Sequence, residues 1–379
     1  MKNNLKIKIN GICVKSLFLG LSLLKNNNEI YFFDSIKTNT KSNYKDKFFA
    51  ITNSTKVILE ELKIWENLET KMYGFKYLSI YDKPMSKEKI FNYIDLYPKS
   101  EIIKNIGWTI KYEELKELLL KKLSIDVNVN FLKNDDNYFS QSKFDYEFFF
   151  GEFYKEFSKR NIKNLFNYPK SYSSMVFKLM VRSDFDERAY KIFLKNESIT
   201  MIPLAENIYQ IIWNASTKKL KSRYGLNINL FLDNFSTMLP NGFKTDQIIG
   251  DLNLLSNPSS LSNILKFHNN RICINEFSEI SSQLTYNELG SFLMDLKILN
   301  KNLLINKKSK ANYFWSLKIR FYINKFLICF KSSIINITSL KFLKIIFLMH
   351  NLLINSFVFR FVKLPTNSIF KLIFLGSIK

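Results

Sequence analysis

The sequence has few of the residues from which most catalytic sites are built. It contains three cysteines, Cys13, Cys273 and Cys329, and two histidines, His268 and His350. The cysteines are far apart and odd in number, which predicts neither a disulfide framework nor a zinc site and indicates a reducing compartment. Neither histidine has a cysteine or an acidic residue at ligand spacing, which excludes hydrolytic triads and histidine metal sites. Any chemistry must therefore come from a bound cofactor.

Acidic residues are absent from the last 84 residues, 296–379, which carry 15 lysine or arginine residues of a chain with net charge +23. Apolar clusters such as Phe326–Ile328 and Ile345–Leu348 alternate with these cations, a pattern typical of helices on an anionic membrane surface. The longest uncharged run, Ile345–Phe359, has 15 residues, whereas a membrane span needs about 20. We expect basic amphipathic helices that either contact a membrane peripherally or pack on the rest of the protein.

Residues 4–34 have the order of a nucleotide-binding βαβ unit: an apolar strand, Gly11, a helix, an asparagine turn and a second strand. The helix is indicated by apolar or small residues at i, i+3, i+4 and i+7, which are Leu17, Gly20, Leu21 and Leu24. On the pattern G-x-G-x-x-G, Gly11 takes the first glycine position, Cys13 the second and Ser16 the third. Asp34 ends the second strand, where such folds hold a ribose hydroxyl. The alternative is a buried βαβ unit without a ligand.

Local patterns predict further elements along the chain, in which 46% of the 379 residues are hydrophobic. Asn53 and Ser54 are candidate caps of a helix that follows a strand end. The other expected elements are strands at 77–81, 175–182, 199–204 and 208–213 and helices at 112–123 and 226–239. The change to a period of two after Ser171 indicates an antiparallel sheet inserted into an α/β chain.

Three segments carry a resemblance to a known family. Phe49–Thr55 with Leu62–Trp65 is similar to ALS-x-ST…LG-x-W, and Arg188–Phe193 with Met201–Leu204 and Trp213 is similar to AYEIF…LLPL…VW. Ile272–Asp295 keeps the frame of VLIGDAAHxxHPxxGQGLNxGLRD, with Leu289 and Asp295 in place. Together with the βαβ opening, these segments resemble the FAD-dependent aromatic-ring hydroxylases of quinone biosynthesis, the group that contains the ubiquinone-pathway monooxygenases.

The resemblance implies an α/β (α+β) fold in which a Rossmann-like FAD-binding domain carries an inserted antiparallel-sheet substrate domain, followed by C-terminal helices. The implied FAD-binding domain comprises residues 1–81, 105–170 and 266–300. The substrate-sheet domain comprises 82–104 and 171–265, and the basic C-terminal helices comprise 301–379.

The resemblance also implies a function, namely hydroxylation of an aromatic, prenylated quinone precursor with FAD, NAD(P)H and O₂. Lys47 takes the position of the family's arginine near the flavin, Glu276 that of the aspartate at the ribityl–phosphate region, and Asn287 that of a glutamine. With Gly11, Cys13, Ser16 and Asp34, these are the candidate cofactor-binding residues. No side chain is needed as a nucleophile, so no catalytic residue is assigned.

Two other functions remain open. Larger residues replace family glycines in two segments, including Cys13, Tyr286 and Glu288. Tyr286 would crowd the flavin, and Glu288 would add a negative charge that opposes the reduced state. These changes favour a non-catalytic homologue that serves as a binding or assembly partner at a membrane surface. Nucleic-acid binding would follow from the net charge and from lysines interleaved with phenylalanine and tyrosine, but no known nucleic-acid-binding motif supports it. We expect a cytoplasmic protein whose tail either contacts a membrane peripherally or packs on the rest of the protein.

Overall fold

The computed structural model describes residues 4–34, 47–82, 92–96, 104–133, 143–150, 172–182, 187–194, 197–240, 243–256, 265–268, 271–274 and parts of 289–300. The predicted tail, 301–379, and the candidate site residues Glu276 and Asn287 lie outside the described residues. Among the described helices, none has both the length and the apolar character needed to cross a membrane.

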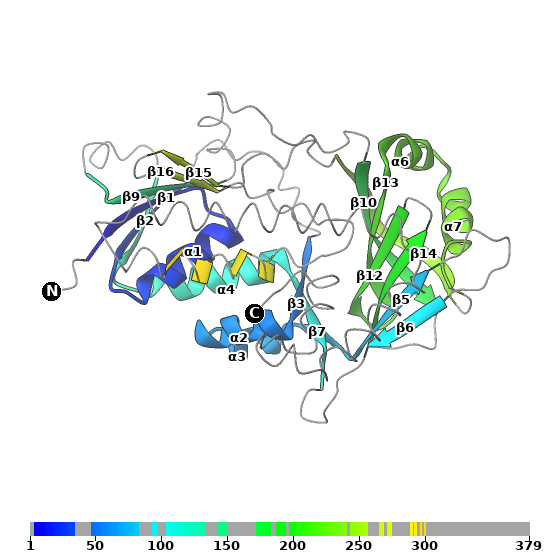
Figure 1. Cartoon of the computed structure of the whole chain (residues 1–379), viewed down its shortest axis with the longest axis horizontal. Helices are drawn as coiled ribbons and strands as arrows, with labels where there is room; N and C mark the ends of the chain where they lie inside the picture. The colour runs from blue at the N-terminus through cyan, green and yellow to red at the C-terminus, as the bar shows by residue number, and fades with distance from the viewer. Residues whose placement is uncertain are drawn as a thin grey trace, which may run out of the picture.

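A six-stranded sheet forms the first half of the molecule (Figure 1). Its strand order is β15 (Leu265–His268), β16 (Arg271–Ile274), β9 (Tyr146–Phe150), β1 (Lys6–Asn10), β2 (Glu29–Asp34) and β8 (Val129–Lys133). All neighbouring pairs are parallel except β15–β16. Helices α1 (Val14–Leu24) and α4 (Tyr112–Ser124) lie side by side against this sheet and share its hydrophobic core. The predicted βαβ opening is confirmed.

Helix α1 contains all four residues whose spacing predicts it. Leu17 is fully buried and Gly20 lies against the ring of Phe32 on β2, where a Cβ atom at position 20 would be 2.5 Å from Cζ. The turn after α1 uses Asn27 in a left-handed conformation, with φ of 56°, which asparagine tolerates better than most residues. The Asn28 side chain holds the turn, because its Nδ2 donates to Leu23 O at 3.0 Å.

A small antiparallel sheet of β3 (Phe48–Thr52), β7 (Gly107–Lys111) and β4 (Tyr73–Phe75) lies between the two larger sheets, next to α2 (Asn53–Glu61) and α3 (Trp65–Glu69) (Figure 1). The predicted caps Asn53 and Ser54 are wrong, because the helix already begins at Asn53 and its N-cap is Thr52. The Asn53 amide donates to Asn105 O at 3.3 Å. The Asn53 side chain, which the sequence predicts as a helix cap, therefore bonds to a residue distant in the chain instead.

A seven-stranded sheet forms the second half. Its order is β14 (Lys244–Ser256), β10 (Tyr172–Arg182), β13 (Ile208–Ser216), β12 (Glu197–Ala205), β11 (Arg188–Leu194), β5 (Tyr77–Asp82) and β6 (Asn92–Leu96). It is antiparallel except for the β11–β5 pair. The predicted antiparallel sheet is confirmed, and its three expected strands extend further than predicted. The structure pairs β5 with the second sheet, although the predicted boundary at residue 81 places most of β5 in the first domain.

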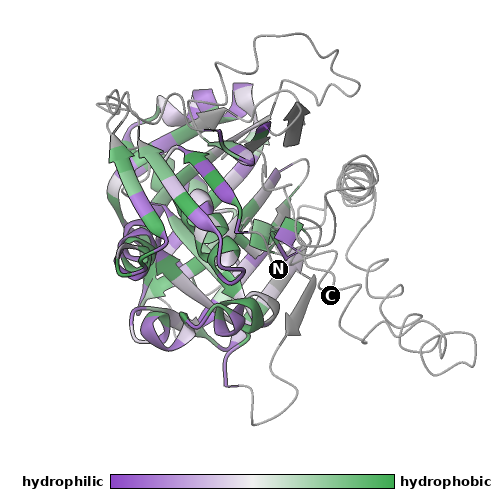
Figure 2. Ribbon diagram, turned by 90° about the vertical axis from the view of Figure 1, so that its left-hand side faces the viewer, coloured by the Kyte–Doolittle hydropathy of each residue, from purple (hydrophilic) through white to green (hydrophobic). Residues whose placement is uncertain are grey.

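Helices α6 (Thr217–Tyr224) and α7 (Ile228–Ser236) cover the outer face of this sheet (Figure 1). The predicted helix 226–239 is too long, because the Asn227 side chain accepts a hydrogen bond from Asn229 N at 3.1 Å and so caps α7. Helix α6 was not predicted, since Leu220 is its one buried residue and leaves no apolar stripe. Figure 2 shows mainly hydrophobic colours along the strands and more hydrophilic colours on helices and turns.

Candidate functional site

The first candidate site lies at the carboxyl edge of the parallel sheet, where β1 passes into α1. Gly11 has φ of +96°, its N–H donates to Phe33 O at 2.8 Å, and a Cβ atom there would be 3.0 Å from Phe150 O. A side chain at this position would be strained in φ and crowded by backbone. Asp34 ends the neighbouring strand β2 at the same edge. The backbone thus brings Gly11 and Asp34 together as in a dinucleotide-binding turn.

Cys13 and Ser16 lie in the first turn of α1 and bond to each other. Cys13 is the N-cap, and its N–H donates to Ser16 Oγ at 2.8 Å. Ser16 N–H in turn donates to Cys13 Sγ at 3.5 Å. Both residues are buried, with exposed fractions of 6% and 0%. This reciprocal arrangement is a capping box, which satisfies backbone donors that a helix N-terminus otherwise leaves free.

Tyr112 joins this site from the start of α4, although sequence reasoning did not select it. Its hydroxyl accepts from Val14 N at 3.4 Å, and its own N–H donates to Lys47 O at 2.9 Å. The Lys47 ammonium lies 6.0 Å from the Tyr112 ring centre and 4.9 Å from that of Phe49. Tyr112 is thus a physical link between Lys47 and the N-terminus of α1. Its place at the start of a predicted helix was the one available signal.

The charges around this helix end are positive. Lys15, in the first turn of α1, is 3% exposed, and its ammonium lies 5.5 Å from the ring centre of Phe292. The first turn contains no acidic residue. A helix N-terminus carries a partial positive charge, which favours an anion. The charge pattern of Lys15, Lys47 and the helix end therefore suits a phosphate group.

Of the seven predicted cofactor-binding residues, the structure brings Gly11, Cys13 and Ser16 into one turn and places Lys47 near them through Tyr112. Asp34 lies at the end of β2. Glu276 and Asn287 lie outside the described residues, beyond β16, which runs parallel to β9 and ends at Ile274. The binding roles of all seven residues stay predictions.

A second candidate region lies where the small sheet meets the seven-stranded sheet. Thr109 Oγ1 donates to Pro203 O at 2.7 Å, and the Lys178 ammonium lies 5.5 Å from the Phe48 ring centre. Beside these contacts is a cavity of about 270 Å³ whose lining includes Phe48, Tyr73, Thr109, Lys111 and Leu204. This volume is close to the smallest typical ligand pocket, about 300 Å³. Its lining combines aromatic residues with two lysines, Lys71 and Lys111, and one acidic residue, Glu114.

The face of the seven-stranded sheet opposite α6 and α7 is polar and buried. Ser198, Asn214 and Ser174 form a row across three strands, and Ser174 Oγ donates to Asn214 Oδ1 at 2.5 Å. Lys191, in the next row, is 7% exposed and donates to Thr200 Oγ1. Burial lowers the pKa of Lys191 to about 7. A buried face with these groups can orient a polar or acidic ligand.

Within the described ranges, no group of three or more histidine, cysteine or acidic side chains could hold a metal ion. FAD is the group that the resemblance implies, and the turn at Gly11 together with the charges of Lys15 and Lys47 suits its diphosphate. The hydrogen-bond donors do not fit, because the N–H groups of Cys13, Val14 and Ser16 already bond to protein atoms. The site thus matches a diphosphate in charge but not in free donors.

No family model matches the chain, and no curated protein matches its sequence. Solved structures do match its fold. PqsL from Pseudomonas aeruginosa, described as a probable FAD-dependent monooxygenase and solved with 2-aminobenzoylacetate, is 11% identical with a TM-score of 0.57. The match covers 88% of this chain and 97% of PqsL.

Two further structures show the same fold. A geranylgeranyl bacteriochlorophyll reductase-like protein from Thermoplasma acidophilum is 12% identical over 89% of both chains, with a TM-score of 0.58. HpxO from Klebsiella pneumoniae, solved with FAD, is 9% identical over 88% of this chain and 90% of its own, with a TM-score of 0.53. The fold of this chain is therefore the Rossmann-like α/β fold of FAD-binding flavoproteins, and the neighbours include monooxygenases and a reductase-like protein.

Proposed function

We propose that this chain is a flavin-dependent oxidoreductase that hydroxylates an aromatic compound. The observation that carries the proposal is the extent of the structural match, which covers 88% of this chain and 97% of PqsL. A likeness limited to the βαβ unit would support nucleotide binding alone. A match over 88% of this chain extends well beyond that unit.

The proposed cofactor is FAD, which supplies redox chemistry when bound. Gly11 gives the close turn, Lys15 and Lys47 supply positive charge, and Asp34, which ends β2, is proposed to bind a ribose hydroxyl. Glu276 and Asn287 are proposed for the flavin side from the resemblance. NADH or NADPH is the proposed reductant, because the resembling hydroxylases use one of them.

The proposed substrate is an aromatic molecule with a polar or acidic group. The cavity lined by Phe48, Tyr73 and Lys111 supports this choice, and so does the buried amine of Lys191, which lies outside the lining of that cavity. PqsL was solved with 2-aminobenzoylacetate, an aromatic acid. A prenylated quinone precursor is the more specific form of the proposal, and it rests on the resemblance of Arg188–Phe193 and Met201–Leu204 to the quinone-pathway hydroxylases.

A spectrum of the purified full-length protein with and without added FAD tests this function. We expect the absorption bands of bound oxidised flavin, bleached by NADH or NADPH in the absence of oxygen. Apo-protein that binds FAD but is never reduced by either nucleotide would restrict the proposal to flavin binding. A colourless protein that ignores FAD would contradict the oxidoreductase.

A second candidate function is a non-catalytic homologue that acts as a binding partner at a membrane surface. The occupied N–H groups of Cys13, Val14 and Ser16 favour it, because a protein released from flavin binding can fill those donors with its own side chains. The same spectrum discriminates the two functions. The proposed membrane contact belongs to residues 301–379 and rests on their charge and apolar clusters.

A further inference from the structure

The N-terminal turn of α1 contains the donors that a diphosphate would need in this fold. In a dinucleotide-binding βαβ unit, backbone N–H groups at this helix end face the phosphates. Here the N–H of Cys13 donates to Ser16 Oγ at 2.8 Å, that of Val14 to Tyr112 Oη at 3.4 Å, and that of Ser16 to Cys13 Sγ at 3.5 Å. Three donors of this helix end, the N–H groups of residues 13, 14 and 16, thus have partners within the protein.

We infer that Ser16 and Tyr112 close the phosphate-facing end of α1 and thereby set a low affinity for FAD. The inference rests on the proposed function only in taking FAD as the ligand. The charges of Lys15 and Lys47 suit an anion, so the low affinity is attributed to the occupied backbone N–H groups.

Ser16 is the stronger of the two closing groups. Its hydroxyl lies 2.8 Å from both Cys13 N and Cys13 O, so it accepts from one and donates to the other. It is fully buried. A diphosphate oxygen could receive the Cys13 N–H only after this hydroxyl moves, and exchanging one buried hydrogen bond for another gives little net free energy.

Tyr112 closes the end from a different element. Its backbone is fixed by the bond to Lys47 O, its ring packs on Phe49 at 5.8 Å between centres, and it is 3% exposed. At 3.4 Å its hydroxyl makes the weaker bond, which a phosphate would displace first. The Tyr112 hydroxyl therefore occupies the N–H of Val14, and a bound phosphate can still displace it.

The test compares FAD affinity in four full-length proteins: the wild type, Tyr112→Phe, Ser16→Ala and the double variant. Each substitution removes one accepting hydroxyl and leaves the backbone donor in place. Because a charge-assisted hydrogen bond to phosphate is worth about 1.5 kcal/mol or more, each freed donor should tighten FAD binding by about tenfold. Tyr31→Phe is the matched control, since its hydroxyl bonds to Glu29 on β2 at 3.0 Å, away from α1.

A second measurement checks the closure without FAD. The freed donors are buried, so Tyr112→Phe and Ser16→Ala should lower the Tm of the apo-protein, and FAD should raise their Tm more than that of the wild type. Hydrogen exchange of the peptide containing residues 13 and 14 should be slow in the apo wild type and faster in the two variants.

The outcomes separate this inference from the proposed function. Tight FAD binding by the wild type, unchanged by both substitutions, would overturn the inference and leave the function standing. Absence of FAD binding in all four proteins would overturn both, because open donors would then not restore affinity. Weak binding by the wild type and tighter binding by the variants, with Tyr31→Phe unchanged, would establish the inference.

Discussion

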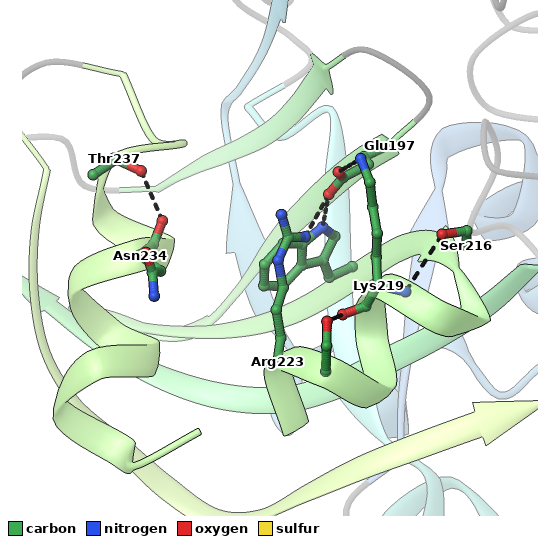
Figure 3. Close-up of polar contacts among 8 residues, drawn as sticks. Glu197, Ser216, Lys219, Arg223, Asn234 and Thr237 are labelled. Carbon is green, nitrogen blue, oxygen red and sulfur yellow. Dashed lines mark hydrogen bonds and ion pairs between the residues drawn. The ribbon is translucent and has the colours of Figure 1, made fainter. Parts of the chain in front are cut away.

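At the scale of single residues, Glu197 shows how a buried charge is held in the second sheet. Its side chain is 6% exposed at the start of β12 and accepts from Trp213 Nε1 at 3.0 Å, Lys219 Nζ at 2.8 Å and Arg223 Nη1 at 2.6 Å (Figure 3). The Arg223 guanidinium also lies 4.2 Å from the Trp213 ring centre. The indole N–H and both cations thus bond to the same carboxylate. Because Lys219 and Arg223 belong to α6, these bonds fix α6 on the sheet. We assign this cluster to stability.

Glu197→Gln should lower the free energy of unfolding by about 2 kcal/mol at neutral pH, because it removes a charge that two cations and an indole N–H surround. Asp246→Asn is the matched control. Its partner Arg182 is 75% exposed, and exposed pairs contribute about 0 to 1 kcal/mol. Denaturant unfolding of the three proteins measures the difference, and equal losses in both variants would contradict the assignment.

The pH dependence of this loss has a defined sign. Burial alone raises the pKa of Glu197, but hydrogen bonds and charges from Arg223 and Lys219 outweigh burial and hold it below the ordinary value. A carboxylate with a lowered folded pKa stabilises above its unfolded pKa, and this stabilisation is lost as pH falls through the folded pKa. The wild type and Glu197→Gln should therefore converge in stability on acidification below about pH 4.

At the scale of elements, a glycine at position 20 allows helix α1 to pack closely on the parallel sheet. Gly20 lets the helix approach the fully buried ring of Phe32, which itself stacks on Phe131 at 5.0 Å between centres. The apolar stripe of α1 predicts which face is buried, but the closeness of that face to β2 depends on this contact. The same approach places the first turn of α1 against Tyr112 of α4.

Gly20→Ala should destabilise the protein by about 1 to 2 kcal/mol, even though alanine favours helix by about 1 kcal/mol, because overpacking a core contact costs more. Gly225→Ala is the control, since the nearest contacts of its Cβ atom would be the carbonyl oxygens of Lys221 and Ser222 at 3.9 Å and its φ is −80°. We expect it to change stability by less than about 0.5 kcal/mol. Thermal unfolding measures both, and a stabilised Gly20→Ala variant would refute the close approach.

At the scale of the whole molecule, charge divides the chain into a body and a basic tail. Residues up to 300 belong to the body, since Leu296 and Leu299 are 3% exposed and Asn300 Nδ2 donates to Ser22 O at 3.1 Å. Lys297 also pairs with Glu61 of α2 at 2.7 Å. A truncation that tests the tail must therefore end after residue 300, so that these contacts remain.

The truncated chain 1–300 should lose binding to vesicles that contain anionic lipid, whereas the full chain should pellet with them. Binding of the full chain should weaken as salt is added, because the Debye length falls from about 10 Å at 0.1 M to about 3 Å at 1 M. Vesicles of neutral lipid are the control. Unchanged pelleting of the truncated chain would refute the membrane proposal, provided that its Tm matches that of the full chain.

The sequence by itself determined the elements whose signals are local. Hydrophobic periodicity is a property of a single segment, so it can be recognised without the tertiary structure. The spacing of Leu17 and Leu21 predicts α1, and the period of two around Met175 and Ile211 predicts the antiparallel sheet. Gly11 was identified for the same reason, since a tight turn needs its freedom in φ. Helix α6 was not predicted, because a single buried residue, Leu220, cannot form a periodic apolar pattern.

Only the tertiary structure decided how the candidate site is filled. Tyr112 reaches the N–H of Val14 across 98 positions of the chain, and Asn53 bonds to Asn105 instead of capping its own helix. Hydrogen-bond partners of this kind depend on which elements pack together, and a local pattern holds no information about that choice. The sequence therefore held no signal that the donors at the N-terminus of α1 are occupied.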